Sequence, residues 1–119
     1  PPRSTLFPYT TLFRSDQGYN FNAINCGGNE PIHQEREQWS DGANAFTLAP
    51  GKIISYARNN ETTAALQQAG YRQIDAADFI ANTADHMADD QQLVITTASA
   101  ELPRGRGGPR CLTLPLDRA

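Results

Sequence analysis

The sequence has few of the features that mark a disulfide scaffold, a membrane span or a nucleic-acid binder. It contains two cysteines, one methionine and one tryptophan in 119 residues. A disulfide scaffold carries more cysteines, so we expect a reduced, cytoplasmic compartment, although a single Cys26–Cys111 bridge stays open. No apolar run approaches the roughly 18 residues of a membrane-spanning helix. The formal net charge is -3 and no basic stripe is present, which argues against nucleic acid as a partner.

The opening segment, residues 1–15, has a pattern that suits no secondary structure. It reads PPRSTLFPYTTLFRS, with a repeated Thr-Leu-Phe step and neither a helix cap nor a clear hydrophobic period. It resembles, codon by codon, the conceptual translation of a common short-read sequencing adapter. We therefore expect residues 1–15 to be non-native and exclude them from the fold. The protein sequence proper then covers residues 16–119.

The rest of the chain has the hydrophobic periodicities of an α/β protein. Strands are predicted at residues 19–25, 45–49, 52–56, 71–75, 93–96 and 111–115. Helices are predicted at 31–39 and at 60–69, the second with Asn60 as its N-cap, and one or two helical turns at 76–82. The acidic residues 84–90 are expected to form a solvated loop or an insertion. Between the first helix and the strand at 45–49, Asp41, Gly42 and Asn44 are explained by turn formation.

The chemically informative segment is the glycine-rich loop that ends at Cys111. Residues 104–111 read RGRGGPRC, so three arginines surround one thiol. Nearby cations favour the thiolate, which is the nucleophilic form of cysteine. A planar arginine can also hold a carboxylate through two hydrogen bonds. The same residues are compatible with an exposed basic loop around a small hydrophobic cysteine, or with a phosphate-binding loop. Against the latter, no helix pattern and no Walker-type lysine follow the glycines.

Several ordered motifs carry a family resemblance. They are EREQWSDGAN at 35–44, APG at 49–51, YARN at 56–59, AG at 69–70 and RGRGGPRCLTLPL at 104–116. Together they resemble the C-terminal region of the arginine deiminases, within the guanidine-modifying enzymes. The resemblance implies an α/β propeller (pentein-like) of five ββαβ-like blades. Residues 16–119 would then be a C-terminal fragment of the catalytic domain, with about one blade and part of another.

The resemblance also implies an activity and two site residues. Cys111 matches the nucleophile that attacks the guanidinium carbon of L-arginine, releases ammonia and forms a thiouronium adduct, which water converts to citrulline. Arg106 matches the arginine that holds the substrate carboxylate, although other family members differ around this position. The resemblance implies no metal and no organic cofactor. An amidinotransferase, a methylarginine hydrolase and a non-catalytic homologue remain alternatives, and a homo-oligomeric parent stays open.

The family's remaining machinery has no match in this chain. The resemblance implies two carboxylates that grip the guanidinium and a His-x-Asp pair, all located upstream. His86 is followed two positions later by Ala88, and His33 directly precedes the EREQW stretch, so neither fits the pair. A metal site built from Cys26, His33, His86 and Cys111 lacks any supporting spacing. We therefore expect the isolated chain to be inactive.

Overall fold

The computed structural model describes residues 22–114 and 116–117, so the expected adapter segment and the start of the strand expected at 19–25 lie outside it. Its elements in chain order are α2 (Pro31–Trp39), β1 (Phe46–Ala49), β2 (Lys52–Tyr56), α3 (Asn60–Gln68), β3 (Arg72–Asp75), α4 (Ala76–Ala81), α5 (Thr83–Ala88), β4 (Leu93–Thr97) and the 3-10 helix η2 (Leu102–Gly105). None of the helices in this described part is long and apolar enough to cross a bilayer.

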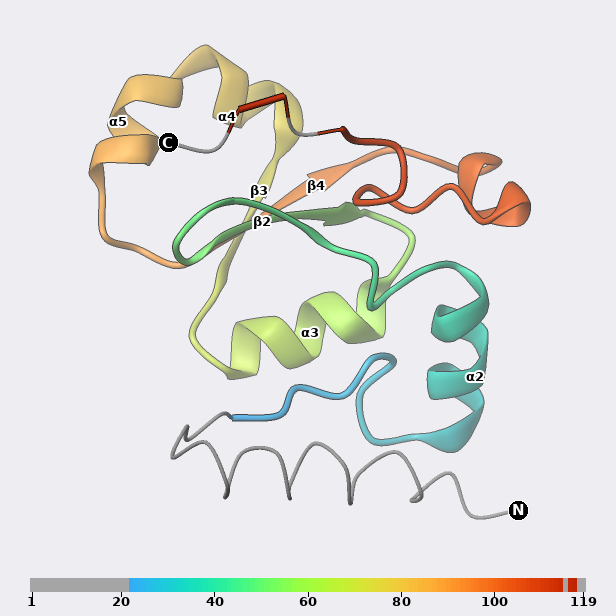
Figure 1. The fold of residues 1–119 in the computed structure, drawn as a ribbon. Coiled ribbons are helices and arrows are strands. Elements are labelled where there is room, and N and C mark those ends of the chain that lie inside the picture. Colours follow the sequence, from blue (N-terminus) through green and yellow to red (C-terminus); the bar gives the residue numbers. More distant parts are fainter. Residues whose placement is uncertain (1–21, 115, 118–119) are drawn as a thin grey trace, which may run out of the picture.

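The strands form one mixed four-stranded sheet in the order β1-β2-β4-β3 (Figure 1). β1 pairs with β2 antiparallel, whereas β4 pairs in parallel with both of its neighbours, β2 and β3. In this register Ile95 lies between Ile54 and Ile74. The prediction of an α/β fold is confirmed. The sheet order adds that β4, although last in sequence, occupies a central position.

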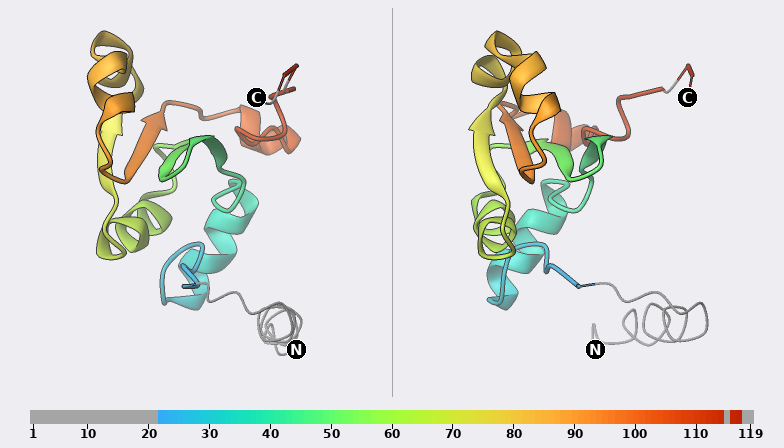
Figure 2. Two further views of the ribbon diagram at one scale, coloured as in Figure 1. Left: turned by 60° about the vertical axis from the view of Figure 1, so that its left-hand side comes forward. Right: turned by 90° about the vertical axis from the view of Figure 1, so that its left-hand side faces the viewer.

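The core lies around β4, which is buried along four of its five residues. Leu93 and Ile95 point to one face, where they pack with Phe79 of α4, and partly buried Ile54 and Ile74 surround this cluster. A strand with parallel neighbours on both sides is covered on both faces, which accounts for the three successive apolar residues at 93–95. In the view of Figure 1, α3 lies below the sheet and α4 and α5 lie above it, and Figure 2 shows the same elements from two further sides.

Two predicted strands are absent from the described residues. Residues 22–25 have no strand, because the edges of the sheet are formed by β1 and β3 and neither pairs with this segment. A strand needs a ladder partner, whatever its side-chain alternation. The short strand predicted at 111–115 is also wrong: the chain turns at residues 109–112, where the Leu112 N–H donates to the Gly108 carbonyl over 3.2 Å.

The acidic segment is helical rather than a loop. α5 covers Thr83–Ala88, with Asp85 in its first turn, the favourable end for a negative charge, and His86 in its last. The His86 ring stacks on Phe79 of the core cluster with a centroid distance of 5.7 Å. Helix α3 begins at Asn60, so its N-cap is Asn59 and not Asn60. The acidic segment is solvent-exposed as predicted, apart from the half-buried His86, but it forms a helix instead of a loop.

A buried carboxylate joins α2 to α3. Glu37 of α2 has no exposed surface. It accepts hydrogen bonds from the backbone N–H groups of Glu61 and Thr62 at 2.9 and 2.8 Å and from the Thr62 hydroxyl at 2.6 Å. The first N–H groups of a helix lack intrahelical partners, and Asn59 makes no side-chain cap bond, so Glu37 caps α3 from another helix. Burial alone would raise the pKa of Glu37, but these hydrogen bonds and that from Arg36 hold it below the ordinary value.

Candidate functional site

The candidate site lies where β2 and β4 end, beside η2 and the end of α2 (Figure 1). After β4 the chain passes through η2 and returns along the end of β2. There the buried Tyr56 donates its hydroxyl hydrogen to the Gly107 carbonyl over 2.7 Å. Burial raises the pKa of this hydroxyl, and the charges of Asp41 and Cys111 act in the same direction, against a hydrogen bond with Ser99. Tyr56 therefore keeps its proton and anchors the glycine-rich loop to the sheet.

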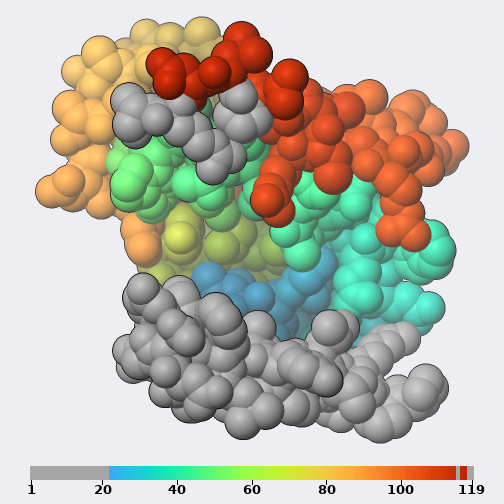
Figure 3. All heavy atoms as spheres, in the orientation of Figure 1, coloured from blue at the N-terminus to red at the C-terminus, as the bar shows by residue number. Residues whose placement is uncertain are grey.

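Asn44 connects the turn before β1 to the predicted nucleophile. Its Nδ2 lies 2.8 Å from Cys111 Sγ, and its Oδ1 accepts the Arg110 N–H over 3.0 Å. Gly108 passes so close that an added Cβ would lie 2.4 Å from Asn44 Cγ, which requires glycine at this position. Figure 3 shows the C-terminal residues, in red, against the β1–β2 hairpin and the end of α2. One asparagine thus contacts three residues of the loop.

Arg106 points to a different partner. It follows η2 in the left-handed conformation, with φ 62°, and its guanidinium carbon lies 4.8 Å from the centroid of the Trp39 ring. A cation over an indole face is attracted by the ring quadrupole. Around this pair lies a depression lined by Arg36, Trp39, Ser40, Arg58, Pro103, Arg104 and Arg106. The two predicted site residues therefore share one loop but have separate partners, Trp39 for Arg106 and Asn44 for Cys111.

The two cysteines are both free thiols in different surroundings. Cys111 is exposed, whereas Cys26 is half-buried against Thr62 and Gly42. Burial raises the pKa of the Cys26 thiol, and the charge of Glu37 adds to this effect against a hydrogen bond with Thr62. The bridge between Cys26 and Cys111 that the sequence left open is not formed.

This difference predicts selective alkylation at neutral pH. Iodoacetamide reacts with the thiolate, so we expect Cys111 to react at least roughly tenfold faster than Cys26 in the folded chain. Peptide mass spectrometry after short exposures measures both rates in one sample. In denaturant the two rates should converge, since the burial of Cys26 is lost. Equal rates in the folded chain would contradict the structural difference between the two thiols.

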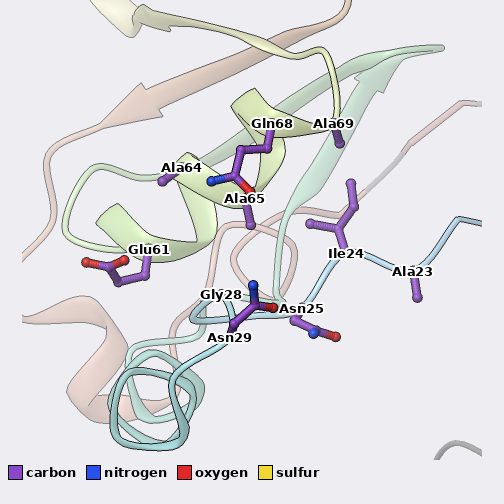
Figure 4. Close-up of a pocket in the computed structure, with 10 residues that line it drawn as sticks. All are labelled: Ala23, Ile24, Asn25, Gly28, Asn29, Glu61, Ala64, Ala65, Gln68 and Ala69. Carbon is purple, nitrogen blue, oxygen red and sulfur yellow. The ribbon is translucent and has the colours of Figure 1, made fainter.

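A second depression lies away from the glycine-rich loop, between residues 23–29 and one face of α3 (Figure 4). Alanines of α3 form much of its wall, and Asn25, Asn29, Glu61 and Gln68 supply polar groups at its border. Neither Cys111 nor Arg106 lines it. Among residues 22–114 and 116–117, no three His, Cys, Asp or Glu side chains gather as metal ligands would.

The loop was predicted from the sequence, but the residues that hold it in place were not. Asn44 was explained by turn formation and Tyr56 by strand formation, yet both contact the 107–111 segment. The signal that could have identified Asn44 and Tyr56 is that both lie within the motifs that carry the family resemblance. Periodicity carries no information on contacts between residues 67 or 51 positions apart.

Comparison with known proteins matches almost the whole chain and not the site alone. The family model described as "Arginine deiminase" matches residues 15–118. The chain is 43% identical over 107 residues to an arginine deiminase of Mycoplasma capricolum subsp. capricolum, covering 90% of this chain and 21% of that protein. It is 40% identical over 101 residues to that of Borrelia duttonii (85% and 20%), and 41% identical over 95 residues to that of Listeria monocytogenes serotype 4a (80% and 18%). The chain thus spans about a fifth of the length of these curated relatives. It belongs to the arginine deiminase family.

Proposed function

We propose that the complete protein containing this sequence hydrolyses L-arginine to L-citrulline and ammonia, with Cys111 as the nucleophile. The observation that carries the proposal is an exposed Cys111 thiol, hydrogen-bonded by Asn44, at the end of an arginine- and glycine-rich loop. Membership of the arginine deiminase family and the names of the relatives support the choice of substrate. The family resemblance assigns no metal or organic cofactor to this chemistry.

The reaction divides into two displacements at one carbon. The Cys111 thiolate bonds to the guanidinium carbon of arginine, the bond from that carbon to a terminal nitrogen breaks, and the nitrogen leaves with an added proton as ammonia. Water then adds to the thiouronium carbon, the carbon–sulfur bond breaks, and both protons of the water are lost as its oxygen becomes the carbonyl oxygen of citrulline and the thiolate returns. The carboxylates and the base for these proton transfers match no residue of 16–119, so the chain alone is expected to be inactive.

Arg106 would hold the substrate α-carboxylate in this mechanism. A guanidinium matches a carboxylate with two parallel hydrogen bonds. Its present position over the Trp39 ring leaves the guanidinium at the wall of an arginine-lined depression. Binding of the carboxylate would therefore exchange a cation–π contact for an ion pair.

The fold proposal is that β1, β2, α3 and β3, with β4 inserted between β2 and β3, belong to one blade of a pentein-like propeller. The strand–strand–helix–strand order and the mixed sheet support it. A cytoplasmic location suits the two free thiols.

We also infer that residues 1–15 are adapter-derived, which is supported by a family match that starts at residue 15. Reading the source DNA upstream of the Asp16 codon tests this inference, and fifteen codons that continue as a natural gene would refute it.

The test of function is a substrate panel on the complete protein recovered from that source gene. We expect citrulline and ammonia from L-arginine, and no reaction from the 119-residue chain. Transfer of the amidino group to glycine would identify an amidinotransferase, and a preference for methylated arginine a methylarginine hydrolase. Absence of turnover with every guanidine, in a folded protein, would leave a non-catalytic homologue.

A further inference from the structure

The carboxamide of Asn44 has a role at the nucleophile that the family comparison does not assign. We propose that Asn44 holds the Cys111 sulfur for attack by donating a hydrogen bond from its Nδ2 to the thiolate. The distance between the two atoms is 2.8 Å. The expected effect on the rate of arginine hydrolysis rests on the proposed function, whereas the hydrogen bond from Asn44 to the sulfur does not.

The orientation of the amide follows from its second contact. The backbone N–H of Arg110 can only donate, so the atom that faces it at 3.0 Å must be the acceptor oxygen, Oδ1. The NH₂ group then faces the sulfur of Cys111. The opposite orientation would place two donors against each other at Arg110 and two acceptors against each other at Cys111. The backbone N–H of Arg110 therefore determines that the NH₂ end of the Asn44 amide faces the thiol of Cys111.

Asn44 is itself held in place by the turn before β1. Its backbone N–H donates to the Asp41 carbonyl over 2.9 Å, and Asp41 has the left-handed φ of 57° that this tight turn requires. The Gly42 N–H donates to the Glu37 carbonyl over 2.7 Å, which ties the turn to α2. On the other side Gly108 packs directly against the side chain. The amide therefore has little freedom to rotate away from the sulfur.

A donor at the sulfur suits the charge changes of the reaction. Hydrogen bonds to an ionised acceptor are stronger than those to a neutral one. The Cys111 sulfur is anionic before attack and after release of product, and neutral in the covalent adduct. The Asn44 N–H thus favours the attacking and departing thiolate. The Arg110 contact fixes the orientation of the amide, and the Nδ2–Sγ contact is the part of Asn44 that acts on the thiol.

Alkylation of the 119-residue chain tests the hydrogen bond between Asn44 and Cys111 without any substrate. Asn44→Asp keeps an acceptor for the Arg110 N–H but replaces the donor at the sulfur by a negative oxygen. We expect iodoacetamide to alkylate Cys111 of this variant roughly tenfold more slowly at neutral pH, with the rate profile moved to higher pH. Asn44→Ala, which removes the donor without adding charge, should slow the reaction a few-fold. Asn29→Asp, at an exposed asparagine, is the control for added charge and should leave the profile unchanged.

The half-buried Cys26 reports on folding in the same samples. Its slow alkylation should persist in both Asn44 variants. If Cys111 of both variants reacts as in the unsubstituted chain, the proposal is wrong. Rapid alkylation of Cys26 in both would overturn it too, because Asn44 would then be needed for folding and not for the sulfur.

The complete protein separates this inference from the proposed function. There Asn44→Asp should lower kcat about tenfold or more while KM for arginine stays within about twofold, because the contact is made to the nucleophile and not to bound substrate. A complete protein that hydrolyses no guanidine, with alkylation altered as expected, would refute the proposed function and leave the Asn44–Cys111 contact established.

Discussion

Replacing Cys111 by serine in the complete protein should abolish citrulline formation, with kcat at least roughly a thousandfold lower. Serine fits the space of cysteine, but its hydroxyl is not ionised near neutral pH, and among residues 22–114 and 116–117 no base contacts position 111. Because Cys111 is exposed, the substitution should leave the free energy of unfolding within about 0.5 kcal/mol of that of the unsubstituted protein. Citrulline assays together with thermal unfolding measure both effects.

Cys26→Ser is the matched control for this substitution. Cys26 is the other free thiol and contacts Thr62 and Gly42 on the α2–α3 side of the molecule. Its serine variant should keep arginine hydrolysis, with some loss of stability because a hydroxyl replaces a half-buried sulfur. Substantial citrulline production by the Cys111→Ser variant, or complete loss in the Cys26→Ser variant, would refute the assignment of the nucleophile.

Replacing Glu37 by alanine should cost about 3–5 kcal/mol of folding free energy, the largest stability effect we expect in this chain. The substitution leaves the N–H groups of Glu61 and Thr62 buried without their acceptor, and it opens a cavity between α2 and α3. A single domain is stable by only about 5–15 kcal/mol, so this loss would be a large fraction of the total stability. Urea denaturation of the variant and the unsubstituted chain gives the difference.

The conservative variant Glu37→Gln removes only the negative charge of the side chain, so it tests how that charge contributes to stability at different pH. The folded-state pKa of Glu37 lies below its ordinary value of 4.5, so its contribution is complete above that pH and is lost as the pH falls through the folded pKa. The stability difference between the unsubstituted chain and Glu37→Gln should therefore shrink on acidification. Glu30→Gln, at an exposed residue without a side-chain cap bond, is the matched control and should change little. A pH-independent difference at Glu37 would refute the role of its charge.

Local sequence predicted most of the elements that carry the site. The strands at Lys52–Tyr56 and Leu93–Thr97 and the helix that begins at Asn60 follow local apolar patterns. The helix at Pro31–Trp39 follows from its early proline. The arginines and glycines around Cys111 also stand next to one another in sequence, so the candidate nucleophile needed no structure to be found. Local patterns failed at residues 22–25, 83–88 and 111–114, where a pairing partner or a packing contact decides the conformation.

The sequence by itself thus determined the α/β class, the family motifs and Cys111 as the candidate nucleophile. Only the tertiary structure decided that β4 enters between β2 and β3, that Glu37 caps α3, and that Arg106 lies on Trp39. It also placed Asn44 against Cys111, 67 positions away. The physical reason is range: periodicity, caps and turns act over a few residues, whereas hydrogen bonds between distant segments depend on how the whole sheet and its helices pack.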